Sequence, residues 1–258
     1  MDVSWLISSL LAVAIGLSLG LLGGGGSILT VPALVFAVGM PPEVAVGTSL
    51  AVVGLNALLG TALQARRGKV NWRAAAIFGG AGIVGAYLGS FFTHFVPGTL
   101  LLVLFALLML VVAMMMLRPM HAGMAEHTPH WGTALAAGFG VGLLTGFLGV
   151  GGGFLIVPAL VLLVGLSMTS AVATSLPIIA LNSASGFLGH LSQAPLDWAV
   201  TLRFVAFGAI GVVLGVRLAN RVPAYKLRTW FAWFVIAVAI YMLARILLPL
   251  TGWFPAAH

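Results

Sequence analysis

Two glycine-rich runs in this sequence have the composition of an anion site made from backbone alone. They are Gly23-Gly24-Gly25-Gly26-Ser27 and Gly149-Val150-Gly151-Gly152-Gly153. Each run lies in a long apolar stretch, where a break leaves the first N–H groups of the following helix without helical partners. Those groups and the positive end of the helix dipole attract negative charge without a cationic side chain. The runs therefore predict two helix breaks whose glycines and Ser27 bind an anion.

A proline follows each run, at Pro32 and Pro158. Proline is tolerated near a helix start, where an N–H has no partner to lose. Neither run continues into Gly-Lys-Ser/Thr, and neither fits a dinucleotide fingerprint between strands, so nucleotide binding is not expected. The structural alternative is that these glycines only allow close packing of helices.

Hydroxyl and amide side chains recur on the segment that follows each break. Two residues seven apart share a helix face, and the pairs in question are Ser49 with Asn56 and Ser175 with Asn182, beside Thr48 and Thr174. Such groups can hydrogen-bond an oxyanion without the cost of burying a charge. We predict that they line a pocket, although serine can also bond within its own helix and asparagine can join helices.

Other reactive residues give weaker signals. His190 could carry a proton during transport, and the alternative is a polar residue at a helix end. His121, His127 and His130 lack a cysteine partner and make a poor metal set. Ser185 and His190 lie on one predicted helix without an orienting group, which does not make a hydrolase. We therefore predict no enzyme activity, no metal and no cofactor.

The second half of the chain repeats the first without a gap. Gly16 aligns with Gly142 and Pro97 with Pro223, an offset of 126 residues, and Asn56 and Trp72 also have identical mates. Apolar composition alone would not pair proline, asparagine and tryptophan in one register, so the chain is an internal duplication. We predict one membrane domain, 1–258, made of repeat 4–117, a cytoplasmic loop 118–130 and repeat 131–249.

Composition sets the class of protein. Of 258 residues, 62% are hydrophobic, and only 11 Lys and Arg and 4 Asp and Glu are charged, with mean hydropathy +1.21. A soluble domain carries about 25% charged residues, so a solvated enzyme and a nucleic-acid binder are excluded. Charge-free runs exceed the roughly 20 residues that a spanning helix needs. The sequence therefore predicts an all-α polytopic protein of the inner or plasma membrane.

Charge in equivalent loops indicates that the repeats are inverted. The loop after segment 44–65 contains Arg66, Arg67, Lys69 and Arg73, whereas its mate at 192–197 contains no base. The turn at 93–98 also lacks a base, whereas its mate region holds Arg217, Arg221, Lys226 and Arg228. Since basic loops stay in the cytoplasm, the halves must insert in opposite directions. Each half then has a broken or re-entrant pair, with short segments at 28–39 and 154–166, plus about three spanning helices.

At these residues the chain resembles the sulfite exporter TauE/SafE family of membrane permeases. The resemblance rests on the stretch from Gly20 to Leu34, its mate from Gly146 to Leu160, and the Thr-Ser-Leu triplets at 48–50 and 174–176. It covers nearly the whole chain. It implies secondary transport, in the export direction, of small sulfur-containing anions such as sulfite or sulfonates like sulfoacetate.

Several alternatives stay open from sequence. They are a passive anion channel, an uptake permease for another small organic anion, and an assembly subunit without transport. A cation or metal permease is disfavoured because intramembrane acids are nearly absent. No ATP-binding element is recognised, so the energy would come from an ion or substrate gradient, or from a partner. The expected partners are the anion and membrane lipids, with no nucleic acid, and a homodimer is left open.

Overall fold

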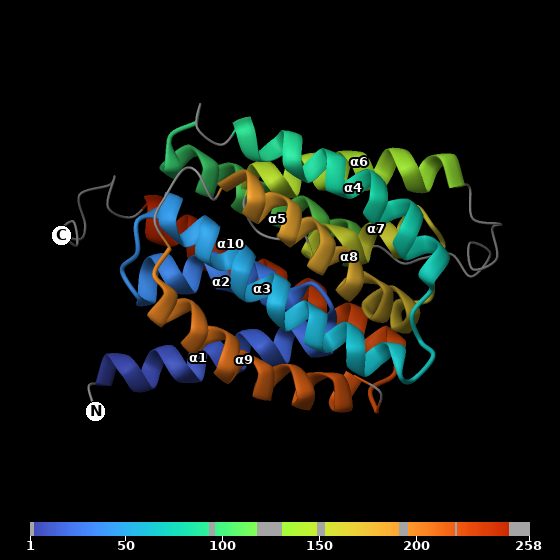
Figure 1. The fold of residues 1–258 in the computed structure, drawn as a ribbon, viewed down its shortest axis with the longest axis horizontal. Coiled ribbons are helices and arrows are strands. Elements are labelled where there is room, and N and C mark those ends of the chain that lie inside the picture. Colours follow the sequence, from blue (N-terminus) through green and yellow to red (C-terminus); the bar gives the residue numbers. More distant parts are fainter. Residues whose placement is uncertain are drawn as a thin grey trace.

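The computed structural model describes residues 3–92, 96–117, 131–148, 153–190, 196–219 and 221–247. The predicted loop 118–130 and the glycines 149, 151 and 152 lie outside these residues. Within them the chain is helical and contains no strand (Figure 1). The elements are α1 Val3–Leu22, α2 Gly25–Pro32, the π-helix η1 Ala33–Ala37, α3 Pro42–Ala65, α4 Trp72–Phe92, α5 Gly98–Leu117, α6 Trp131–Leu148, α7 Gly153–Leu162, α8 Met168–His190, α9 Trp198–Ala219 and α10 Ala224–Leu247.

The two short segments differ from their predicted bounds. The segment predicted at 28–39 begins three residues earlier, at Gly25, because first-turn N–H groups need no helical partner and glycine is tolerated there. Pro32 lacks an N–H, and the backbone changes to a π-helix directly after it. Gly39 and Gly165, at φ of +80° and +78°, adopt the left-handed conformation just beyond the two short helical segments. For this reason α7 stops at Leu162 rather than at residue 166.

The chain is a multi-pass membrane protein. Six helices are long and apolar enough to cross a bilayer, as judged on the described residues: α3, α4, α6, α8, α9 and α10. Their long axes run in one general direction across the molecule (Figure 1). This confirms the all-α polytopic class predicted from composition.

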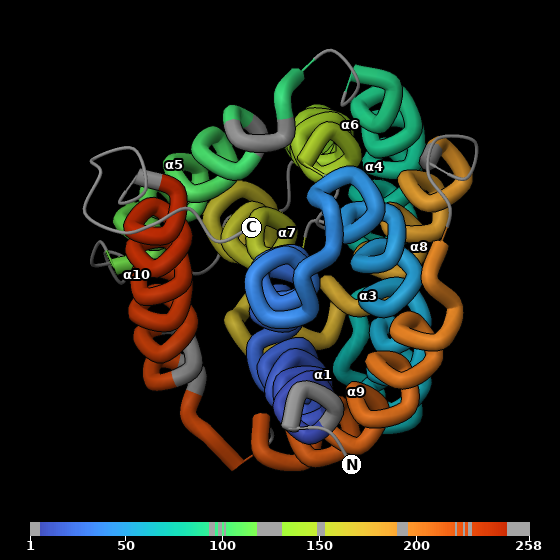
Figure 2. The backbone as a smooth tube through the Cα atoms, turned by 90° about the vertical axis from the view of Figure 1, so that its left-hand side faces the viewer, coloured from blue at the N-terminus to red at the C-terminus, as the bar shows by residue number. Residues whose placement is uncertain are grey.

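The two short helices form the centre of the bundle. All residues of α7 from Gly153 to Val161 are buried, and in α2 only Leu29 is partly exposed. Seen along the bundle, α7 lies inside the surrounding helices, with α5 and α10 on one side and α8 on the other (Figure 2). Because the first break opens onto these central helices and its glycines are buried, its polar backbone is shielded by protein rather than exposed to lipid.

Helices of one half pack tightly on helices of the other. A methyl group placed on Gly16 of α1 would collide with the carbonyl of Gly208 in α9. The same placement on Gly142 of α6 would collide with the carbonyl of Gly82 in α4. Small residues at such crossings let two backbones approach closely. Each contact therefore has a counterpart 126 residues away in the chain, with the roles of the two halves exchanged.

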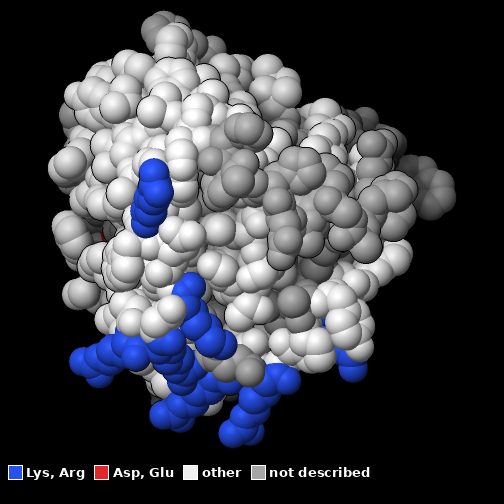
Figure 3. Space-filling view, turned by 90° about the vertical axis from the view of Figure 1, so that its right-hand side faces the viewer, with Lys and Arg blue, Asp and Glu red and all other residues white. Residues whose placement is uncertain are grey.

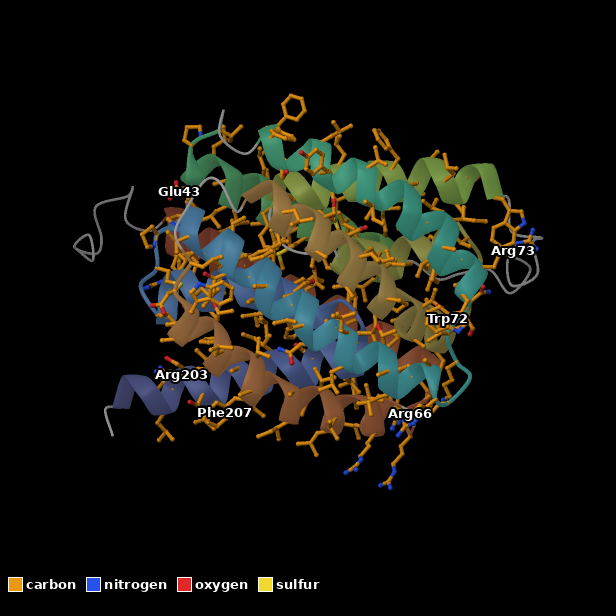
Figure 4. All side chains as sticks on the ribbon, in the orientation of Figure 1. Glu43, Arg66, Trp72, Arg73, Arg203 and Phe207 are labelled. Carbon is orange, nitrogen blue, oxygen red and sulfur yellow. The ribbon has the colours of Figure 1, made fainter. Side chains whose placement is uncertain are left out.

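Charge separates toward the two ends of the bundle. Arg66 and Arg73 lie at one end, whereas Glu43 and Arg203 lie at the other (Figure 4). The view onto the first end shows Lys and Arg gathered mainly in its lower half (Figure 3). The loop between α3 and α4 thus belongs to a basic end, as its sequence suggests.

Candidate functional site

The first glycine run forms a sharp elbow between α1 and α2. Helix α1 ends at Leu22 and α2 begins at Gly25, with Gly23 at φ +73°. The N–H of Gly23 donates to the carbonyl of Leu19 at 2.9 Å, and that of Gly24 to the carbonyl of Leu22 at 2.8 Å. These two N–H groups are therefore already bonded. The backbone N–H groups that remain as predicted donors to an anion are those of the first turn of α2, at Gly25, Gly26 and Ser27.

The first break meets the start of α7 inside the protein. A methyl group on Gly24 would collide with the carbonyl of Gly153, and one on Gly153 would lie 2.6 Å from the Cα of Gly24. Gly153 is the last residue of the second glycine run and the first residue of α7. The elbow of the first half thus touches the start of the short helix of the second half. The three predicted site glycines 149, 151 and 152 lie outside the described residues.

The elbow also packs against α8. A Cβ on Gly23 would lie 2.5 Å from the Oγ of Ser175 and 3.0 Å from the carbonyl oxygen of Val172. Ser175 donates its hydroxyl to that same carbonyl at 2.9 Å, and Ser27 donates to the carbonyl of Gly24 at 2.7 Å. Both predicted site residues therefore lie at the elbow, with their hydroxyl protons already used locally.

Polar atoms without partners are concentrated on two helices. Elsewhere buried hydroxyls bond back to their own helix, as Ser18, Thr30 and Thr145 do at 2.8 to 2.9 Å. Among the described residues, every buried side-chain oxygen or nitrogen without a hydrogen bond belongs to α3 or α8. These atoms are Thr48 Oγ1, Ser49 Oγ, both amide atoms of Asn56, Gln64 Oε1, both amide atoms of Asn182, and Ser183 Oγ.

These unpartnered atoms are unfavourable in this conformation. An unsatisfied buried polar group costs about 1–3 kcal/mol, and the unpartnered atoms of the described residues are gathered on only two helices. Structural asparagines that join helices would be bonded, whereas both amide atoms of Asn56 and Asn182 lack partners. The α3 and α8 pair can therefore offer hydrogen bonds to water or to a solute. None of the buried side chains in the described part of the chain is charged.

The two asparagines occupy equivalent places. The position of a Cβ on Gly208 lies 2.6 Å from Nδ2 of Asn56, and that on Gly82 lies 2.7 Å from Oδ1 of Asn182. Each amide thus rests against the glycine of a helix crossing, where any side chain would displace it. The role of these two glycines is not visible in the sequence, because it depends on which helices cross.

The other polar residues differ in whether they have a hydrogen-bond partner, and the sequence repeat does not reveal this difference. Thr174 accepts a hydrogen bond from the N–H of Asn71 at 2.9 Å, whereas its mate Thr48 has no partner. Two unpartnered residues, Gln64 and Ser183, were not among the predicted site residues. Ser183 was hidden because its repeat mate is Ala57, although it directly follows Asn182.

The remaining predictions gain no support from the geometry. His190 closes α8, and its side chain lies outside the described residues, as do the three histidines of segment 118–130. No group of three potential metal ligands occurs in the described parts of the chain. The described site therefore consists of neutral hydroxyls, amides and backbone groups.

Comparison with known proteins places this chain among membrane transporters. Residues 8–242 match the model of the family described as sulfite exporter TauE/SafE. A probable membrane transporter protein of Xylella fastidiosa is 39% identical over 241 residues, covering 90% of this chain and 92% of the relative. The probable membrane transporter protein YunE of Bacillus subtilis is 30% identical over 280 residues, covering 95% and 96%. No solved structure matches the chain.

Proposed function

The chain belongs to the sulfite exporter TauE/SafE family of membrane transporters, and from this premise we propose that it is a secondary exporter of small sulfur-containing anions. The proposed substrates are sulfite and organosulfonates such as sulfoacetate. The transporter works without a cofactor and is not an enzyme. Access to its single membrane domain, 1–258, alternates between the two sides as the repeats 4–117 and 131–249 move against each other.

The unpartnered polar atoms on α3 and α8 are the observation that carries this proposal. They lie on the helices that follow the two breaks, and the first elbow touches α8 at Ser175. Neutral donors stabilise an oxyanion through hydrogen bonds without holding it as tightly as a buried cation would. Weak holding suits a transporter, which must release what it binds. In the proposed site, Gly25, Gly26 and Ser27 offer backbone donors, and Gly23 and Gly24 form the elbow that positions them. The other members are Thr48, Ser49, Asn56, Gly149, Gly151, Gly152, Gly153, Thr174, Ser175 and Asn182, with Gln64 and Ser183 added from the structure.

The exchanged contacts relate the two halves as a pair, and the charge at the ends of the bundle supports the proposed inversion. Gly16 meets Gly208 and Gly142 meets Gly82. The two contacts are repeat equivalents in which the halves have exchanged roles. The position of Arg66 and Arg73 at one end of the bundle supports a cytoplasmic location for that end under the positive-inside rule (Figure 4). Broken helices at the interface of inverted repeats are the usual binding site of secondary transporters.

Ligand-dependent stability tests the site. The purified protein would be heated with sulfite, sulfate, thiosulfate, sulfoacetate, taurine or a carboxylate, since a ligand at 100 times its Kd stabilises by about 2.7 kcal/mol. Ser49→Ala should lose most of the anion-dependent shift. Ser18→Ala is the matched control, because Ser18 is buried but bonded to the carbonyl of Ile15. A full shift in Ser49→Ala, or no shift with any sulfur anion, would refute the proposed site.

Flux measurements test the transport cycle. In proteoliposomes the rate should saturate with anion concentration, and anion on the far side should accelerate exchange. A passive channel would show neither property. Flux that rises linearly with concentration and ignores the far side would therefore replace the alternating-access proposal with the channel.

A further inference from the structure

The loop between α3 and α4 is tied to the second half of the chain. The backbone N–H of Asn71 donates to Oγ1 of Thr174 in α8 at 2.9 Å. Nearby, Nη1 of Arg67 donates to the carbonyl of Val216 in α9 at 3.1 Å. This loop lies at the basic end of the bundle, next to Arg66 (Figure 4). Two hydrogen bonds between the halves therefore hold that end together.

The same parts exist at the opposite end. The repeat mate of Asn71 is Asp197, and the mate of Thr174 is Thr48. Both loop residues cap the next helix, since Oδ1 of Asn71 accepts from the N–H of Ala74 and Oδ1 of Asp197 accepts from the N–H of Val200, each at 3.0 Å. The local backbone is thus prepared in the same way at both positions.

Only one of the two equivalent bonds is made. Thr174 has its backbone partner, whereas the hydroxyl oxygen of Thr48 is buried, is wholly inaccessible and bonds to nothing. Thr48 does not bond back to its own helix either, as Thr30 and Thr145 do. A buried hydroxyl without a partner is unfavourable in this conformation and would be satisfied in another.

We propose that these two threonines are the acceptors of two latches that close opposite ends of the transport path in turn. In the first latch, Thr174 accepts from the N–H of Asn71 and closes the basic end. In the second latch, Thr48 accepts from the N–H of Asp197 and closes the other end. The structure is the state with the first latch made and the second open. This inference rests on the proposed transport function and assigns Thr48 and Thr174 to gating.

The absence of cysteine from the chain makes a direct test available. One variant carries Asn71→Cys with Thr174→Cys, a second carries Thr48→Cys with Asp197→Cys, and a third carries all four substitutions. Each pair should form a disulfide on mild oxidation in membranes, since the latched positions are close enough for one. In the third variant either disulfide should form, but not both in one molecule. Failure of the second pair to cross-link, or both disulfides in one molecule, would overturn the latches.

A labelling experiment measures the first latch without any substrate. The reporter is Gln64→Cys, because Gln64 lies at the end of α3 near the loop and is only 1% exposed. Thr174→Val removes the acceptor and should speed labelling by an impermeant thiol reagent from the cytoplasmic side by about 2- to 10-fold. Thr174→Ser keeps an acceptor and should label at the original rate.

The control for this substitution is Thr145→Val. Thr145 is equally buried, but its hydroxyl bonds to the carbonyl of Gly142 in its own helix. Equal labelling rates in Thr145→Val and Thr174→Val would refute the first latch. Because labelling and cross-linking need no anion, they can succeed when the anion-dependent stability test fails. The reverse outcome would leave the transport proposal standing and remove only the latches.

Discussion

The elbow at Gly23 allows a prediction whose two physical causes can be measured separately. Gly23 has φ +73°, and a Cβ there would lie 2.5 Å from Oγ of Ser175 and 3.0 Å from the carbonyl oxygen of Val172. One neighbour is a short side chain and the other is helix backbone, so neither can move far. Gly23→Ala should therefore suffer both from its backbone conformation and from the contact with α8.

The two costs are of similar size. An alanine in the left-handed conformation costs about 1–2 kcal/mol, and forcing a methyl into a packed site costs about 1–3 kcal/mol. We expect Gly23→Ala to lower the free energy of unfolding by about 2–5 kcal/mol. For a chain of this length, that corresponds to a melting temperature lower by roughly 5–15 °C.

Three further variants separate the causes: Gly68→Ala, Ser175→Ala, and Ser175→Ala combined with Gly23→Ala. Gly68→Ala has φ +65° and no neighbour within 4 Å, so it reports the backbone cost alone. Adding Ser175→Ala to Gly23→Ala removes the nearest atom, and the double-mutant cycle should give a coupling of about 1–3 kcal/mol. Thermal unfolding of the purified protein in detergent, followed by tryptophan fluorescence, measures all four. The reasoning fails if Gly23→Ala and Gly68→Ala have the same melting temperature and the coupling free energy between Gly23→Ala and Ser175→Ala is zero.

Three other predictions follow from buried groups and loop charge. Asn56→Leu and Asn182→Leu each remove an unpartnered amide, so thermal unfolding should show a stability that is unchanged or raised by about 1–2 kcal/mol. Anion flux should fall in both variants. A loss of stability with normal flux would instead make the amides structural. Gly142→Ala puts a methyl against the backbone of α4 and should cost about 1–3 kcal/mol, whereas Gly140→Ala meets open space and should melt as the parent does. Lys69→Cys should react with an impermeant reagent only in inside-out membranes, and labelling in intact cells would reverse the predicted orientation.

The sequence by itself determined the membrane class, the family and the approximate place of the predicted segments. Helix α3 runs from Pro42 to Ala65, two residues longer at its start than the predicted segment 44–65. These features are local, because the length of an apolar run and the positions of glycine and proline decide where a membrane helix can begin and end. The first break was also predictable, since four consecutive glycines make a helix interior unfavourable.

Only the tertiary structure decided how the polar residues are used. The repeat gives Thr48 and Thr174 the same sequence context, yet one is bonded to Asn71 and the other is not. The repeat also gave no sign of Ser183, because its repeat mate is not polar. The sequence could not show that Gly24 touches Gly153. The partner of Thr174 lies 103 residues away in the chain. That information is held in the packing of helices against one another, which no local pattern specifies.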